Sequence, residues 1–136
     1  MPDEPSPLAG FAGGTEWIID ASGCCEAHLR DATRLRAVCD DVVADLGLSV
    51  VGEPQLHTFP EPGGVTALYL LSESHLACHT YPEFGFATFN LYCCRRRRAW
   101  DWESELVQRL EAESVTVRQV AREMRSSVLA KEGLKP

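Results

Sequence analysis

The sequence predicts one α+β domain: a two-layer sandwich in which two helices pack on one face of a mainly antiparallel sheet. Two segments have apolar residues at helical spacing, and several short runs favour strands. Turn residues join successive strand runs, which favours hairpins and therefore antiparallel pairing. With 136 residues, 45% of them hydrophobic, the chain can bury one core but has no room for a second.

The N-terminal half predicts a strand, a helix and a second strand. Residues 17–20 (WIID) are short and β-favouring. A helix then ends at Gly47, because apolar residues recur with helical spacing at Leu35, Val38, Val42, Val43 and Leu46. Residues 48–56 are the second expected strand, and residues 60–64 form a turn-rich loop.

The C-terminal half predicts four more strands and one helix. Residues 65–71 (VTALYLL) are a continuous apolar run, as in a buried strand. Residues 75–80 and 84–94 form a hairpin around a turn at Pro82, which suits the first central position of a turn. Residues 114–120 are the last strand, after a helix marked by Trp102, Leu106 and Leu110. The expected order is β-α-β-β-β-β-α-β.

The two ends differ in composition from the rest. Residues 1–13 are rich in proline and glycine and predict a loose arm, whereas residues 123–136 predict a polar tail. Residues 14–122 are then a single domain. No apolar run is long enough to cross a bilayer and the start lacks an export pattern, so we expect a cytoplasmic protein.

The charge and the cysteines limit the classes of partner. A net charge of −7, spread over both halves, argues against binding nucleic acid or an anionic membrane, so a small molecule is the expected partner. The six cysteines include the adjacent pairs Cys24–Cys25 and Cys93–Cys94 but no CxxC spacing. We expect free thiols and no metal site, with Cys24 and Cys25 in packing and capping roles.

One segment carries a specific resemblance. Residues 71–94 read LSESHLACHTYPEFGFATFNLYCC, a Glu-Ser-His stretch followed by His-Thr-aromatic-Pro-Glu and a later cysteine. This pattern resembles the signature of the prokaryotic S-adenosylmethionine decarboxylase proenzyme family, whose members are pyruvoyl-dependent. The segments WIIDASGC and HTFPEPGGVT look like further family segments, so the resemblance runs from about residue 14 to about residue 120.

The resemblance implies that the chain makes its own cofactor. The hydroxyl of Ser74 would attack the carbonyl of Glu73, and the resulting ester would eliminate and hydrolyse to leave a pyruvoyl group. The chain would then consist of residues 1–73 and 74–136. Decarboxylation of an amino acid needs a carbonyl that forms a Schiff base and delocalises the electrons left behind, which no side chain supplies. The sequence has no glycine-rich phosphate cradle for pyridoxal phosphate.

The resemblance also implies roles for neighbouring residues. His79 would be the base in self-processing, Thr66 would hold the oxyanion, and Cys94 would return a proton to the substrate carbon. Cys93 is the competing thiol, but adjacent strand residues face opposite ways, and we expect Cys93 to pack in the core. Taken alone, Ser74 could be a turn serine and His79 a hydrogen-bonded strand histidine.

The spacing of Ser74 and His79 poses a geometric problem. They are five residues apart, and an odd separation in a regular strand puts side chains on opposite faces. We therefore expect a bulge or turn that brings the Ser74 hydroxyl back to the imidazole, with Ser74 at the end of the strand pair.

The resemblance gives less direct predictions for the substrate-binding residues and for which substrate is used. By resemblance, Phe59 would stack on adenine, and Leu76 and Glu83 would line the pocket, Glu83 accepting from ribose hydroxyls. Residues 95–98 are four arginines that depart from the family pattern and read as a solvated loop. If they reached the pocket they would favour a substrate other than a sulfonium cation.

Several functions are compatible with these residues. The first is decarboxylation of S-adenosylmethionine for spermidine biosynthesis, by a homodimer of cleaved protomers. The same pyruvoyl chemistry on ornithine or arginine is the second, and a regulatory homologue that never cleaves is the third. A thiol or metal module ranks last, because the cysteines and histidines lack ligand spacing. Activation by polyamines stays open.

Overall fold

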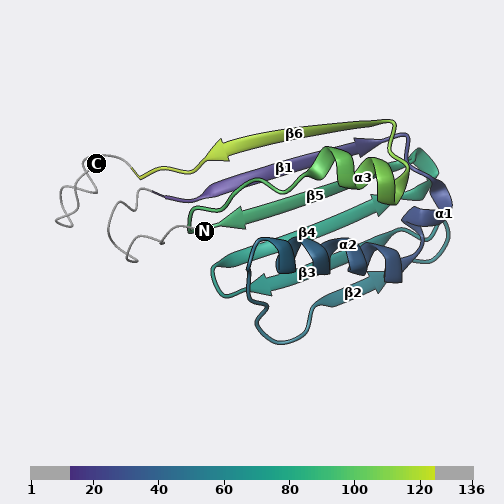
Figure 1. The fold of residues 1–136 in the computed structure, drawn as a ribbon. Coiled ribbons are helices and arrows are strands. Elements are labelled where there is room, and N and C mark those ends of the chain that lie inside the picture. Colours follow the sequence, from purple (N-terminus) through teal and green to yellow (C-terminus); the bar gives the residue numbers. More distant parts are fainter. Residues whose placement is uncertain (1–12, 125–136) are drawn as a thin grey trace.

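A computed structural model describes residues 13–124 of the chain. The expected N-terminal arm and C-terminal tail lie outside the described residues, except for residues 13, 123 and 124. The ribbon shows one sheet with its helices on the same side (Figure 1). In chain order the elements are β1 Thr15–Ser22, α1 Glu26–Leu29, α2 Ala32–Asp45, β2 Gln55–Thr58, β3 Val65–Leu71, β4 Ser74–Tyr81, the 3-10 turn η1 Pro82–Phe84, β5 Phe86–Cys93, α3 Trp102–Leu110 and β6 Ser114–Ala121.

The sheet has six strands in the order β2-β3-β4-β5-β1-β6, and each neighbouring pair is antiparallel. Consecutive strands from β2 to β5 pair through short connections, as the turn residues predict. The first strand, β1, lies between β5 and β6, so the two ends of the described chain are paired inside one sheet. The predicted α+β two-layer sandwich is confirmed.

The element boundaries differ from the sequence prediction in three places. The strand expected at 48–56 is wrong over most of its length: β2 begins at Gln55, and before it there is only an isolated bridge between Val50 and Leu71. Gly52 has a positive φ of 72°, which turns the chain there and interrupts pairing. The short helix α1 was not predicted. Finally, Gly85 in the left-handed conformation ends η1, so β5 begins at Phe86 rather than at residue 84.

The core lies between the helices and one face of the sheet. Helices α2 and α3 bury their apolar stripes against it, at Leu35, Val38, Cys39 and Val42 and at Trp102, Leu106 and Leu110. The strands supply every second residue to the same core, including Trp17, Ile19, Tyr69, Leu76, Cys78, Phe89, Leu91 and Cys93. The expectation that both helices pack on one face is therefore confirmed.

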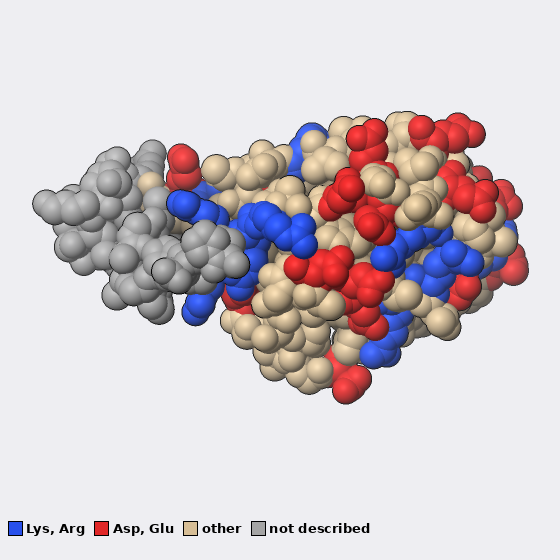
Figure 2. All heavy atoms as spheres, in the orientation of Figure 1, with Lys and Arg blue, Asp and Glu red and all other residues tan. Residues whose placement is uncertain are grey.

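The other face, here called the open face, is covered by no described helix. Its residues alternate with the core residues along each strand, and it exposes Leu68 (48%) and Leu70 (61%) of β3. On the helix-covered face, basic and acidic side chains are interspersed (Figure 2). Within residues 13–124, no helix has the length and apolar character that a membrane crossing requires.

Candidate active site

The expected cleavage point lies in a tight turn at one end of the sheet. Ser72 and Glu73 form the turn between β3 and β4, and Leu71 is paired with Ser74 across it. Ser74 is the first residue of β4, as predicted. On its other side Ser74 is paired with Cys93, so Cys94, the residue after β5, reaches the turn.

The carbonyl group of Glu73 accepts two hydrogen bonds from one residue. The backbone N–H of Cys94 lies 3.2 Å from the Glu73 oxygen, and its thiol Sγ lies 2.6 Å from the same oxygen. Two donors that converge on one carbonyl oxygen can stabilise negative charge there, as in an oxyanion hole. This carbonyl belongs to the Glu73–Ser74 peptide bond.

The side chain of Glu73 is held by the arginine run. Its Oε2 lies 2.5 Å from Nη2 of Arg97, and the two side chains are only 10% and 14% exposed, respectively. The expectation of a solvated loop is therefore wrong for Arg97, although Arg95, Arg96 and Arg98 are exposed. Basic side chains gather over this end of the helix-covered face (Figure 2). No spacing rule could have found the pair, because it depends on how the loop after β5 folds back.

The two adjacent cysteines have opposite environments. Cys93 is fully buried in the core, and Cys94 is exposed. Burial, with a smaller contribution from the Glu73 carboxylate, raises the pKa of the Cys93 thiol to about 12. Only Cys94 is both accessible and in contact with the expected cleavage point.

Thr66 and His79 form a second group, on the open face. They are paired across β3 and β4, and the Thr66 hydroxyl Oγ1 lies 3.1 Å from Nδ1 of His79. Both are half-buried. Next to them is a shallow hollow of about 520 Å³ lined by Pro54, Gln55, Leu56, His57, Thr66 and Leu68. A hydroxyl bonded to an imidazole can orient the ring and assist proton transfer.

The structure separates this pair from Ser74. Strand β4 keeps one continuous register with both neighbours, so it has no bulge between Ser74 and His79. Five residues at about 3.3 Å each put roughly 16 Å between them along the strand. The strand's alternation also puts Ser74 on the helix-covered side and His79 on the open face. The expectation that a bulge or turn joins them is wrong, because regular pairing on both edges of β4 leaves no place for an extra residue.

Two of the three residues expected at the substrate, Phe59 and Glu83, do not adjoin Ser74. Phe59 follows β2, is 48% exposed, and packs edge-on against His57 with 4.5 Å between ring centroids. Glu83 is exposed in η1, beyond the end of β4 opposite Ser74. Leu76 is fully buried beneath the helices. Within one chain, Phe59 and Glu83 thus lie toward the other end of the sheet.

Comparisons with known proteins agree with one another. A family model described as S-adenosylmethionine decarboxylase matches residues 15–123. A protein of Clostridium tetani named S-adenosylmethionine decarboxylase proenzyme is 32% identical over 110 residues, which is 80% of this chain and 86% of that protein. Proteins of the same name are 31% identical over 123 residues in Pelotomaculum thermopropionicum (90% of this chain, 93% of that protein) and 46% identical over 81 residues in Symbiobacterium thermophilum (60% of each).

A solved structure supports the fold. The crystal structure of the adenosylmethionine decarboxylase from Aquifex aeolicus VF5 has a TM-score of 0.68 to this chain at 21% identity. The match covers 84% of this chain and 93% of that one. At this identity the likeness supports the architecture, and the matched sequences described above carry the assignment to a family.

Proposed function

The chain belongs to the S-adenosylmethionine decarboxylase family, and from that premise we propose that it cuts itself between Glu73 and Ser74 and then decarboxylates S-adenosylmethionine. The observation that carries the proposal is the pair of Cys94 donors on the Glu73 carbonyl oxygen. The matched relatives are named proenzymes, which supports processing. The product would be decarboxylated S-adenosylmethionine, for spermidine synthesis.

The self-cleavage begins with the hydroxyl of Ser74. Its oxygen attacks the carbonyl carbon of Glu73, the peptide C–N bond breaks, and the acyl group passes to the serine oxygen as an ester. Negative charge develops on the Glu73 oxygen during this step, where the Cys94 N–H and thiol are placed to stabilise it. A base then removes the proton from the Ser74 α-carbon, and Glu73 departs as a carboxylate. Hydrolysis, with loss of ammonia, leaves the pyruvoyl group at residue 74.

The residues around Ser74 fit such a group. Ser74 begins a strand directly after a two-residue turn, so the pyruvoyl group would be the first residue of the second fragment, at the start of β4, and the nitrogen would leave as ammonia. The pyruvoyl carbonyl would supply an electron sink for the bond electrons of the departing carboxylate. The exposed Cys94 thiol, beside the same turn, would return a proton to the substrate carbon. We expect Cys94→Ala to lose most turnover while cleavage survives, since its backbone N–H remains.

A second protomer would complete the site. His79 and Thr66 are too far along β4 to serve Ser74 of the same chain. The open face carries this pair together with exposed Leu68 and Leu70, and apolar residues on an uncovered sheet face favour association. We therefore propose a homodimer in which the two open faces pack together with their sheets offset, so that the Thr66–His79 group of each chain reaches the Glu73–Ser74 turn of the other around the end of that sheet.

Mass measurement under denaturing conditions tests the cleavage. The purified protein should give fragments 1–73 and 74–136, and Ser74→Ala should give one uncut chain. Carbon dioxide release should occur with S-adenosylmethionine and not with ornithine or arginine. Treatment with hydroxylamine should abolish it. An uncut chain that still released carbon dioxide would sink the proposal.

Co-expression of two inactive variants tests the dimer. Ser74→Ala lacks the nucleophile and His79→Ala lacks the base, so each should stay uncut when expressed alone. In mixed dimers the His79→Ala chain should be cut, because the Ser74→Ala chain supplies the imidazole. The matched control is His75→Ala, which removes an exposed histidine of the same strand bonded to Asn90 and should be cut alone. If the His79→Ala chain stayed whole in mixed dimers, each chain would use its own His79.

A further inference from the structure

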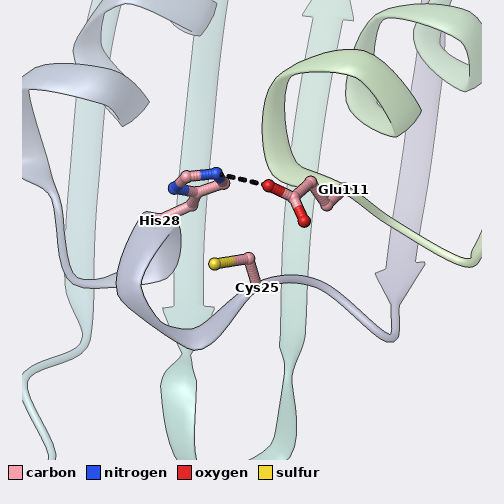
Figure 3. A group of neighbouring side chains, drawn as sticks. All are labelled: Cys25, His28 and Glu111. Atoms are coloured by element: carbon pink, nitrogen blue, oxygen red, sulfur yellow. Dashed lines mark hydrogen bonds and ion pairs between the residues drawn. The ribbon is translucent and has the colours of Figure 1, made fainter.

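Three side chains with metal-binding atoms meet at the end of the sheet opposite the Glu73–Ser74 turn (Figures 1 and 3). They are Cys25, His28 and Glu111, and their ligand atoms all lie within 4.8 Å of one another. Nε2 of His28 is 2.9 Å from Oε2 of Glu111. Figure 3 shows the Cys25 sulfur beside this pair, between α1 and the end of α3. None of the three has a part in the proposed decarboxylation.

The backbone holds the two contributing segments together. Cys25 directly precedes α1, and His28 is three residues later, so one helical turn brings both side chains to the same side. The N–H of Cys25 donates to the carbonyl of Leu110 at 2.9 Å, next to Glu111. A second backbone connection, from the N–H of Glu113 to the carbonyl of Ser22 at 2.9 Å, ties the same two segments. The cluster therefore rests on a fixed backbone frame.

The conformation of Glu111 is unusual for its residue type. Glu111 ends α3 with φ 58° and ψ 36°, in the left-handed region, where glycine is strongly preferred. Among residues 13–124 it is the only residue other than glycine with a positive φ. A strained residue whose carboxylate contacts an imidazole beside a thiol is a reason to look for a function.

We propose that Cys25, His28 and Glu111 bind a zinc ion, with water as the fourth ligand. A thiolate, an imidazole and a carboxylate are all common zinc ligands, and this mixed set suits zinc better than magnesium or calcium. Cys25 and His28 are half-buried and Glu111 is exposed, so an ion has access from solvent. The bound ion would tie α1 to the end of α3.

The proposal differs from the sequence-based expectation that Cys25 only packs or caps and that the chain has no metal site. Sequence spacing could not reveal it, because Glu111 lies 83 residues after His28.

Cobalt substitution tests the thiolate ligand. Full-length protein treated with a chelator is titrated with Co²⁺, and one equivalent should produce visible absorption bands together with a thiolate-to-cobalt charge-transfer band, which Zn²⁺ then removes. Cys25→Ser should abolish the charge-transfer band. The control Cys94→Ser, which removes an exposed thiol at the other end of the sheet, should retain it. No charge-transfer band in the parent, or its survival in Cys25→Ser, would overturn the proposal.

The variant Glu111→Gly tests whether Glu111 is a zinc ligand or only a structural residue at the end of α3. Glycine suits the left-handed conformation, so the metal-free variant should have a higher melting temperature than the parent. Its zinc affinity, measured against a competing chelator, should nevertheless fall by about tenfold or more. Zinc binding as tight as in the parent would exclude the carboxylate as a ligand. Because the readout is metal affinity, this test is independent of self-cleavage.

Discussion

The two groups of expected catalytic residues occupy different environments. The Glu73–Ser74 turn is enclosed by close contacts, with Cys94 on its carbonyl and Arg97 on its carboxylate. The Thr66–His79 pair lies half-buried on the open face, beside a shallow hollow. The first group is thus nearly complete within one chain, whereas the second lacks a reaction centre in its own chain. The two groups lie on opposite faces of one sheet and roughly 16 Å apart along β4, so the proposed dimer would have to bring the pair of one chain to the end of the other chain's sheet.

The largest expected difference is the difference in reactivity between the adjacent thiols of Cys93 and Cys94. Burial raises the pKa of Cys93 from an ordinary 9.0 to about 12, so much less of it is present as thiolate than of an unperturbed cysteine. In folded Ser74→Ala protein, iodoacetamide should therefore modify Cys94 and leave Cys93 unmodified, as read by peptide mass spectrometry. Equal modification of both would mean that β5 does not hold Cys93 in the core.

The two faces of the sheet should differ strongly in their response to truncation. Leu76 is fully buried, so Leu76→Ala should destabilise the fold by about 3 kcal/mol. Leu70 is 61% exposed, so Leu70→Ala should change monomer stability by no more than about 0.5 kcal/mol. Urea unfolding at low protein concentration measures both.

Leu70→Ala should also weaken dimerisation, which sedimentation velocity would measure. If Leu70→Ala greatly lowered the free energy of unfolding in dilute protein, Leu70 would be packed within a single chain. An unchanged dimer would mean that the two protomers meet elsewhere.

Loss of the Glu73–Arg97 ion pair at the turn should have a smaller effect than the changes above, and it should act on the rate of self-cleavage. Arg97→Ala leaves a buried Glu73 carboxylate without its partner, which should disturb the turn and slow self-cleavage by about tenfold. Arg97→Lys should restore part of the rate. The time course of fragment formation in freshly purified precursor measures this.

Arg98→Ala is the matched control, since it removes a positive charge from the same loop but contacts the backbone carbonyl of Asp45. The same slowing in that variant would indicate an effect of loop charge rather than of the Glu73–Arg97 contact.

The smallest expected effect lies on the open face. The hydrogen bond from Asn90 to the Glu16 carboxylate lowers the pKa of Glu16, with a further contribution from Arg122, while partial burial opposes the shift. Because the folded pKa lies below the ordinary 4.5, this contribution to stability is present above about pH 4.5 and is lost as pH falls through the lower folded value.

Asn90→Ala should therefore cost less than about 1 kcal/mol at pH 7 and still less at pH 3, as measured by urea unfolding. A variant whose cost stayed constant with pH would show that Asn90 acts through contacts other than the Glu16 carboxylate.

Much of this fold could be predicted from local sequence. The alternation of Leu76 and Cys78, and the helical spacing of Leu35, Val38 and Val42, both report which side chains face the core. The strand expected at 48–56 failed because Gly52 has a positive φ, which an apolar pattern does not reveal. The motif around Ser74 identified the family and predicted a cleavage point without any knowledge of the fold.

The sequence alone determined the family, the α+β class, the placement of Cys93 in the core and the candidate nucleophile, because each depends on neighbouring residues or on a local motif. Only the tertiary structure decided that His79 faces away from Ser74, that Arg97 pairs with Glu73, and that Glu111 meets Cys25 and His28. The physical reason is the distance along the sequence over which each kind of interaction acts. Side-chain alternation and helical spacing act over a few residues, whereas the meeting of distant side chains depends on strand register and loop paths that the whole core sets together.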